Sequence, residues 1–157
     1  MFAHKFVDQV DTHADQLCEL FMQRIKGSDR CRALLQRVPA VELQQSIRTI
    51  YRNLIDCLLN QTDSVSEELY LRLGARRAQQ GVPSPASFWA VCASRQYFWE
   101  YMESETLLED PADVWGGVEL LRSLDQFFDR VLYLIIMGYQ TGGKNEVPVP
   151  AAVSTEI

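Results

Sequence analysis

The chain has 157 residues, a length that suits one domain with a buried core of its own. Its composition, 47% hydrophobic and 23% charged, is that of an ordinary globular protein and argues against disorder of the whole chain. The formal net charge of −6 argues against a surface for nucleic acid or for an anionic membrane, because both require clustered positive charge.

Apolar residues spaced three and four apart recur along most of the chain and predict helices. The predicted helices cover approximately residues 2–26, 29–37, 40–60, 65–80, 85–103 and 111–139. Gly27 and Gly81 fit the left-handed turn that ends a helix, and Ser84 with Pro85 fits the start of the next one. We therefore expect an all-α protein, a single bundle of five to six helices with a long C-terminal helix.

The chain from residue 141 to 157 contains two glycines and two prolines and shows no apolar periodicity. This composition is typical of a tail or a linker. We expect one all-helical domain at residues 1–140, followed by a flexible tail or linker at residues 141–157.

The fourth predicted helix carries a glycine and a small group of arginines. Gly74 lies in its middle, where glycine costs about 1 kcal/mol relative to alanine, so close packing against another helix is the expected reason for it. Arg72, Arg76 and Arg77 closely follow two glutamates. A solvated helix face with internal ion pairs is the expected role of these charges, in preference to a phosphate site.

The fifth predicted helix is rich in aromatic residues, which cover more than one of its faces. One interpretation is that the rings fill the core, and the other is that they line an apolar pocket with an arginine as its polar anchor. The candidate pocket residues are Arg77, Phe88, Trp89, Arg95, Tyr97 and Trp99. A further alternative for Arg77 is a hydrogen bond to the bend at residues 81–84 that locks two helices together.

The last predicted helix carries two adjoining apolar stripes, whereas one domain core needs only one. The first stripe follows a heptad of Leu121, Leu124, Phe128, Val131 and Ile135. The second consists of Leu120, Phe127 and Leu134. We expect this helix to contact a second copy of the chain, an output domain or another partner, and we expect a homodimer. The alternative is that the helix runs through the centre of its own fold.

A short motif joins the fourth and fifth predicted helices. It has the pattern L-G-x-x-R-A-x-x-G-V-P and comprises Leu73, Gly74, Arg77, Ala78, Gly81 and Pro83. An aromatic helix with Trp99-Glu100 near its end follows. With this motif and with the number and order of its helices, the chain resembles, over approximately residues 10–138, the RsbRD N-terminal family. This family is the N-terminal sensor domain of RsbR-type stressosome co-antagonists, and similar domains precede bacterial histidine kinases.

The resemblance implies an all-helical regulatory module without enzymatic activity of its own, which passes a signal to an output domain such as a STAS domain or a kinase. It also implies a bundle similar to a globin without haem. No sequence like an output domain follows Tyr139, so the chain is either a stand-alone module or a piece of a longer protein.

We expect a signal-sensing domain that relays a change in helix packing through its C-terminal helix to a partner or an output domain. One alternative is a globin-like sensor that binds haem or another apolar small molecule. The other is a protein–protein adaptor without a pocket.

The chain offers little for catalysis or metal binding. Its four cysteines form no CxxC pair, so we expect buried thiols in a reducing cytoplasm and no zinc site. Both histidines, His4 and His13, lie in the first helix, whereas a haem globin needs a proximal histidine in its second half, so we predict no haem. His13 lies on an apolar stripe and is expected to be a core histidine. We expect no enzymatic activity and no cofactor, because no known catalytic motif occurs.

Overall fold

The computed structural model describes residues 10–60, 66–104 and 114–146. Within these ranges the chain forms six α-helices and one short 3-10 helix, and no strand. The elements are α2 (Val10–Ile25), η1 (Asp29–Cys31), α3 (Arg32–Arg37), α4 (Ala40–Asn60), α5 (Glu67–Gln79), α6 (Ser84–Ser104) and α7 (Val114–Glu146). The predicted all-α class and the long C-terminal helix are confirmed. None of the described helices is both long and apolar enough to cross a membrane.

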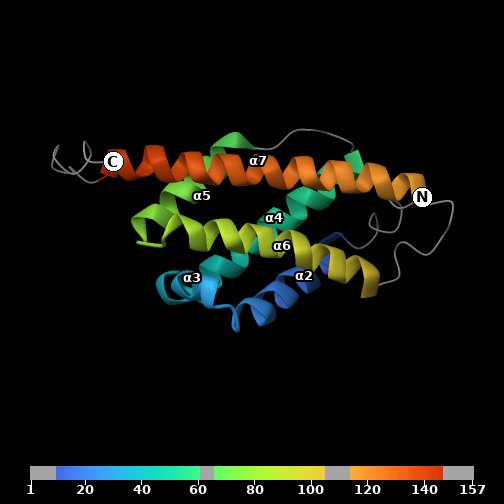
Figure 1. Ribbon diagram of the computed structural model, residues 1–157, viewed down its shortest axis with the longest axis horizontal. Helices are drawn as coiled ribbons and strands as arrows, with labels where there is room; N and C mark the ends of the chain where they lie inside the picture. Colours follow the sequence, from blue (N-terminus) through green and yellow to red (C-terminus); the bar gives the residue numbers. More distant parts are fainter. Residues whose placement is uncertain (1–9, 61–65, 105–113, 147–157) are drawn as a thin grey trace.

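The longest helix, α7, runs along one side of the molecule, and α5 and α6 lie next to it (Figure 1). α2 and α3 lie on the opposite side, and α4 passes between the two sides (Figure 1). The most extensive contact between two helices is that of α5 with α7, followed by that of α2 with α4. Because α7 also packs against α4 and α6, one long helix holds three others.

The core takes large apolar side chains from every long helix of the described ranges. Its bulkiest fully buried members are Tyr51, Tyr70, Phe21, Phe98 and Phe128. The buried hydroxyls keep hydrogen bonds: Tyr51 Oη donates to the Ser94 carbonyl at 2.7 Å, and Asn53 Nδ2 donates to Tyr70 Oη at 3.0 Å. Burial raises the pKa of Tyr70 to about 12, although the bond from Asn53 offsets part of the effect.

The helix ends agree with the predicted ones within a few residues, except at the C-terminus of α7. The predicted end at Tyr139 is wrong, because α7 continues to Glu146. Gly138 and Gly142 lie against α5, where packing outweighs the low helix propensity of glycine. The predicted tail therefore does not begin at residue 141, and residues 147–157 lie outside the described ranges. The predicted starts of the first and last helices, at residues 2 and 111, also lie outside them.

Candidate functional site

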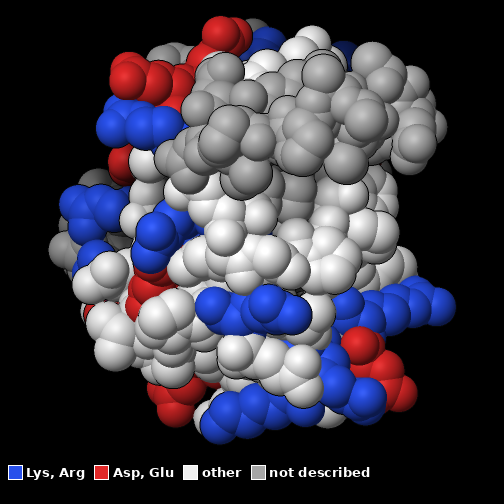
Figure 2. All heavy atoms as spheres, turned by 90° about the vertical axis from the view of Figure 1, so that its left-hand side faces the viewer, with Lys and Arg blue, Asp and Glu red and all other residues white. Residues whose placement is uncertain are grey.

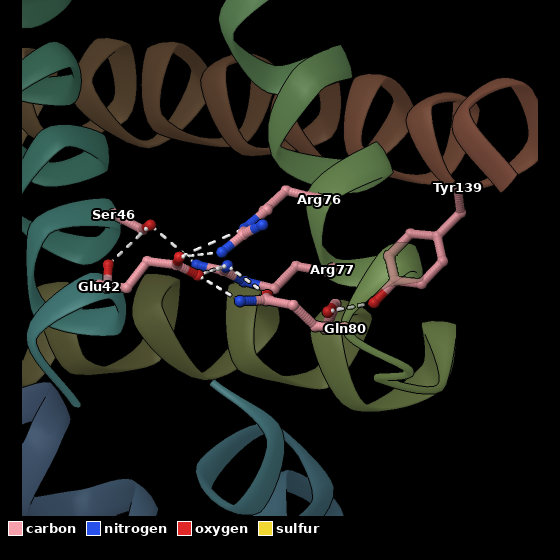
Figure 3. A network of polar contacts seen from close by, with 7 residues as sticks. Glu42, Ser46, Arg76, Arg77, Gln80 and Tyr139 are labelled. Carbon is pink, nitrogen blue, oxygen red and sulfur yellow. Dashed lines mark hydrogen bonds and ion pairs between the residues drawn. The ribbon is translucent and has the colours of Figure 1, made fainter. Parts of the chain in front are cut away.

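A buried arginine joins α5 to α4. Arg77 is only 3% exposed, and its guanidinium extends from the last turn of α5 toward α4 (Figure 3). Its Nη1 donates to Glu42 Oε2 at 2.6 Å and to Gln80 Oε1 at 2.8 Å. Its Nη2 donates to Ser46 Oγ at 2.8 Å. These acceptors matter because a buried charge without partners is strongly destabilising.

Glu42, in the first turn of α4, is the carboxylate partner of this cluster. It also accepts a hydrogen bond from Arg76 Nη2 at 2.9 Å and one from Gln80 Nε2 at 2.6 Å. Burial raises the pKa of the Glu42 carboxyl, but the hydrogen bonds from Arg76, Gln80 and Arg77 outweigh this and hold the pKa below its ordinary value. We call the five residues Glu42, Ser46, Arg76, Arg77 and Gln80 the clamp.

The local sequence favours this arrangement of charges. A carboxylate in the first turn of α4 and arginines in the last turn of α5 each complement the dipole of their own helix. Burial lowers the pKa of Arg77, and Glu42 offsets part of that effect. The guanidinium remains a cation, because arginine does not lose its proton in proteins. The clamp is therefore an ion pair at neutral pH.

The turn after α5 fixes the backbone that carries Arg77. Gly81 adopts a φ of +76°, a left-handed conformation that favours glycine. The Val82 N–H donates to the Arg77 carbonyl and the Gly81 N–H donates to the Ala78 carbonyl, both at 3.0 Å. These bonds close the C-terminal end of α5, as the sequence predicted for Gly81.

On another side, α5 meets α7 with almost no side chains between the two backbones. A Cβ added at Gly74 would overlap the carbonyl oxygen of Ile135 and lie 3.0 Å from the Ile135 Cα. A Cβ at Gly138 would overlap the backbone of α5, and one at Gly142 would overlap the Ala75 side chain. We call Gly74, Gly138 and Gly142 the glycine crossing. The predicted reason for Gly74, close helix packing, is confirmed.

A hydrogen bond and a small cavity complete this region. Ser87 Oγ of α6 and Tyr139 Oη of α7 lie 2.6 Å apart, and burial raises the pKa of Tyr139 although Ser87 and Arg77 offset part of the effect. A cavity of about 30 Å³ lies beside the clamp and is lined by Leu34, Leu43, Ser46, Ile47, Ile50, Leu73, Arg77, Ser87, Ala90, Val91 and Ile135. This volume has room for one or two water molecules, whereas small-molecule pockets measure roughly 300–1,000 Å³.

The structure does not bring the six predicted pocket residues together. Arg77 belongs to the clamp. Arg95 faces α7, where its Nη1 lies 3.6 Å from Asp125 Oδ1. Tyr97 lies on a different side of α6 and meets Phe21 of α2 edge-on, with ring centroids 5.9 Å apart.

The other three predicted pocket residues are equally dispersed. Phe88 and Trp89 are 44% and 38% exposed, and Trp99 is half-buried against the core. Successive residues of a helix point in different directions, so neighbours in the sequence of α6 find different surroundings. Of the two interpretations, a single pocket lined by these six residues therefore gains no support from their positions. The alternative for Arg77, a bond to the bend at residues 81–84 that locks the two helices flanking it, is wrong, because its guanidinium joins α5 to α4 instead.

The predicted contact stripe of α7 lies mostly inside its own subunit. Its buried members are Leu124, Phe128, Val131 and Ile135. Leu121 alone of the five is exposed, at 44%, and Phe127 and Leu134 of the second stripe are buried as well. The side chain of Leu120 lies outside the described part of the chain. The stripes need no partner to be covered, because α4, α5 and α6 pack against α7 within the same chain. The expected homodimer stays a prediction.

The first helix contains the predicted core histidine. His13 is buried, and its Nδ1 is hydrogen-bonded to the Tyr101 hydroxyl, whose own proton is donated to Gln16 Oε1 at 2.6 Å. Of the cysteines, Cys18 and Cys31 are buried, and burial raises the pKa of both thiols. In the described ranges, His, Cys, Asp and Glu side chains nowhere group in threes that could hold a metal ion.

Each residue of the sequence motif has a structural role. Leu73 lines the small cavity, Gly74 belongs to the glycine crossing and Arg77 to the clamp. The Ala78 carbonyl accepts from Gly81, and the Pro83 carbonyl accepts from the first turn of α6. The motif therefore specifies how α5 is held by its neighbours.

Sequence reasoning missed several residues of this region: Glu42, Ser46, Gln80, Gly138, Gly142 and Tyr139. The spacing of Gly138 and Gly142, four apart on one helix face, was a usable signal for close packing. No local signal existed for Glu42, which lies 35 residues from Arg77 in the sequence.

The fold and the site together define an all-helical domain whose distinctive polar side chains hold helices to one another. A comparison with protein-family models matches residues 8–143 to the N-terminal domain of the RsbT co-antagonist protein RsbRD. The match spans most of the chain, so the chain belongs to this family, and the predicted resemblance is confirmed. Family membership makes it a regulatory domain of the stressosome type. Searches among curated proteins and among solved structures give no match, and the likeness to globins stays a prediction.

Proposed function

We propose that this chain is a cytoplasmic, non-enzymatic sensing module that relays a change in helix packing through α7 to a partner or an output domain. One observation supports the proposal most directly: α5 is held on one side by the clamp and on another by the glycine crossing. The first contact depends on charge and the second on backbone shape.

The relay has two steps. A signal that changes the pairing of Arg77 with Glu42 shifts α5 relative to α4. α7 then follows α5, because Gly74 leaves no flexible side chain between the two backbones. α7 has 33 residues and is therefore about 50 Å long, so a small shift at the crossing reaches a distant surface. Packed helices commonly shift by about 1–2 Å in such transitions.

Pulsed electron spin resonance tests the relay by measuring the distance between spin labels at Asp56 of α4 and Gln140 of α7, both exposed positions. Glu42→Gln weakens the clamp without changing the shape of the side chain. We expect it to shift or broaden the distance distribution by about 1–2 Å. Glu68→Gln is the matched control, because Glu68 pairs with Arg72 on the exposed side of α5. An unchanged distribution in the Glu42→Gln variant would rule out the relay.

The ligand-sensor alternative gains no support from the small cavity beside the clamp, which is roughly a tenth of the smallest usual ligand pocket. A visible absorbance spectrum of the purified protein separates the two functions directly. A Soret band would favour the haem sensor over the relay.

Self-association remains part of the proposal, through the exposed apolar side chains of α7, of which Leu121 belongs to the predicted stripe. The exposed apolar side chains of the described part of α7 are Val118, Leu121 and Tyr133. Sedimentation of the wild type and of a Leu121→Glu, Tyr133→Glu variant tests this surface. A wild type that is monomeric at tens of micromolar excludes the homodimer.

A further inference from the structure

The start of α6 presents an aromatic surface that the fold leaves uncovered. Pro85, Phe88 and Trp89 share one side of the helix, since they are three and four residues apart, and all three are exposed. The opposite side of the same turns, with Ala86 and Ala90, is buried in the core. Large exposed aromatic side chains next to one another are unusual on a surface without a binding role.

One arginine lies against these aromatic side chains, and a second lies over the bend that precedes α6. The Arg30 guanidinium lies over the Trp89 ring, with its Cζ 4.2 Å from the ring centroid, a cation–π geometry. Arg37 Nη1 lies over the bend between α5 and α6, 3.1 Å from the position that a Cβ of Gly81 would take. Neither arginine forms an ion pair with another residue in the described ranges. We call Arg30, Arg37, Pro85, Phe88 and Trp89 the α6 patch.

The charge around the α6 patch is positive, although the whole chain carries −6. The segment of residues 26–37 contains Lys26 and three arginines but one carboxylate, Asp29, which already pairs with Arg32. The first three turns of α6 contain no acidic residue. In the view of this end of the molecule, Lys and Arg side chains spread over the lower half, with Asp and Glu side chains beside some of them, and border pale, uncharged surface (Figure 2).

We infer that the α6 patch docks an acidic segment of a partner protein that also carries apolar side chains. Unpaired guanidinium groups bind carboxylates in a bidentate manner, and exposed Trp89 and Phe88 supply area for apolar anchors. Tryptophan and arginine are also the residues that dominate binding energy at protein interfaces. Nucleic acid and anionic membrane are less suited, because a few arginines on a chain of net charge −6 cannot neutralise many phosphates.

The inference goes beyond the proposed relay, because it concerns where a partner binds and not how α7 moves. The α6 patch adjoins the bend that follows Gln80, so an occupant would lie close to the clamp. Binding at the α6 patch and movement of α7 are measured in separate experiments. A negative result for one of these two claims therefore leaves the other standing.

Fluorescence anisotropy on the full chain tests the docking. The probe is a fluorescein-labelled synthetic peptide of about a dozen residues in which Asp and Glu alternate with Leu and Phe. We expect it to bind the wild type and to bind more weakly as salt is added. Arg30→Glu with Arg37→Glu should weaken binding roughly tenfold or more. Trp89→Ala should also weaken it, through loss of the apolar anchor.

The matched control reverses two other exposed arginines, Arg72→Glu with Arg122→Glu, and gives the same net charge. It should leave the affinity for the peptide within about twofold of the wild type. Equal weakening in both double variants would mean that net charge alone attracts the peptide, and the inference would be overturned. Binding of a single-stranded oligonucleotide or of phosphatidylserine vesicles without binding of the peptide would overturn it too. Circular dichroism of each variant confirms that the helices are intact.

Discussion

The two sides of α5 are held in contrasting ways. Against α7, Gly74 allows backbone to touch backbone, and the contact has one geometry because any added side chain overlaps. Against α4, Arg77 reaches a carboxylate through a long charged side chain, and that contact depends on pH and on side-chain conformation. The contrast suggests that α5 and α7 behave as one unit, whereas the contact between α5 and α4 is adjustable.

The largest effect should come from filling the glycine crossing. Gly74→Ala places a Cβ on the Ile135 carbonyl oxygen, which belongs to a backbone and cannot rotate away. We expect the variant to lose about 3 kcal/mol or more of unfolding free energy, at or above the upper end of the usual cost of overpacking, because two helices must separate. Urea denaturation followed by circular dichroism measures this loss.

The control for that substitution is Gly27→Ala. The predicted left-handed turn at Gly27 is wrong, because its φ is not positive, and a Cβ there has nothing within 4 Å. The unfolding free energy of Gly27→Ala should stay within about 0.5 kcal/mol of the wild type. If Gly74→Ala lost as little unfolding free energy as Gly27→Ala, the helices at the glycine crossing would lie less close together than the structure describes.

The next effect should come from removing the carboxylate of the clamp. Glu42→Ala leaves the buried Arg77 with Ser46 and Gln80 but without a counter-charge. We expect a loss of about 2–3 kcal/mol in unfolding free energy, below the usual range for a fully buried pair because Glu42 is partly exposed. Glu68→Ala, which removes an exposed partner of Arg72, should cost less than about 1 kcal/mol. Similar losses in the two variants would contradict the importance of the buried pair.

The pH dependence of stability should separate the two sides of α5. The folded state lowers the pKa of Glu42, so its stabilising contribution is present above the ordinary carboxyl pKa of about 4.3 and is lost as the pH falls through the folded pKa. The difference in unfolding free energy between the wild type and Glu42→Gln should therefore be largest near neutral pH and shrink below about pH 4.5. The difference between the wild type and Gly74→Ala should not follow this curve, since no titrating group lies in that contact.

The smallest effect should come from the hydrogen bond between α6 and α7. Tyr139→Phe removes the hydroxyl that lies 2.6 Å from Ser87 Oγ, with a loss of about 1 kcal/mol. Tyr133→Phe is the control, because Tyr133 is 64% exposed, and it should be neutral. Thermal unfolding measures the melting temperatures of Tyr139→Phe and Tyr133→Phe. Equal melting temperatures would show that water replaces the hydrogen bond to Ser87 without loss of stability.

Prediction from the sequence succeeded where the signal was local. Periodicity placed the helices, Gly81 marked the end of α5, and the motif around Arg77 indicated the family. Prediction failed where a residue's role depends on a distant neighbour. The aromatic side chains of α6 suggested one pocket, but Tyr97 packs against Phe21 of α2, whereas Phe88 and Trp89 are exposed. The two stripes of α7 suggested a partner, but three helices of the same chain cover them.

The amino-acid sequence by itself determined the all-helical class, the approximate helix limits and the family, because helix periodicity, caps and short motifs depend on residues within a few positions of one another. The tertiary structure alone decided that Arg77 pairs with Glu42, that Gly74 touches the backbone of α7, and that Phe88 and Trp89 stay exposed beside Arg30. These contacts join segments far apart in the chain. Which faces meet depends on how all the helices pack at once, and no local pattern encodes that.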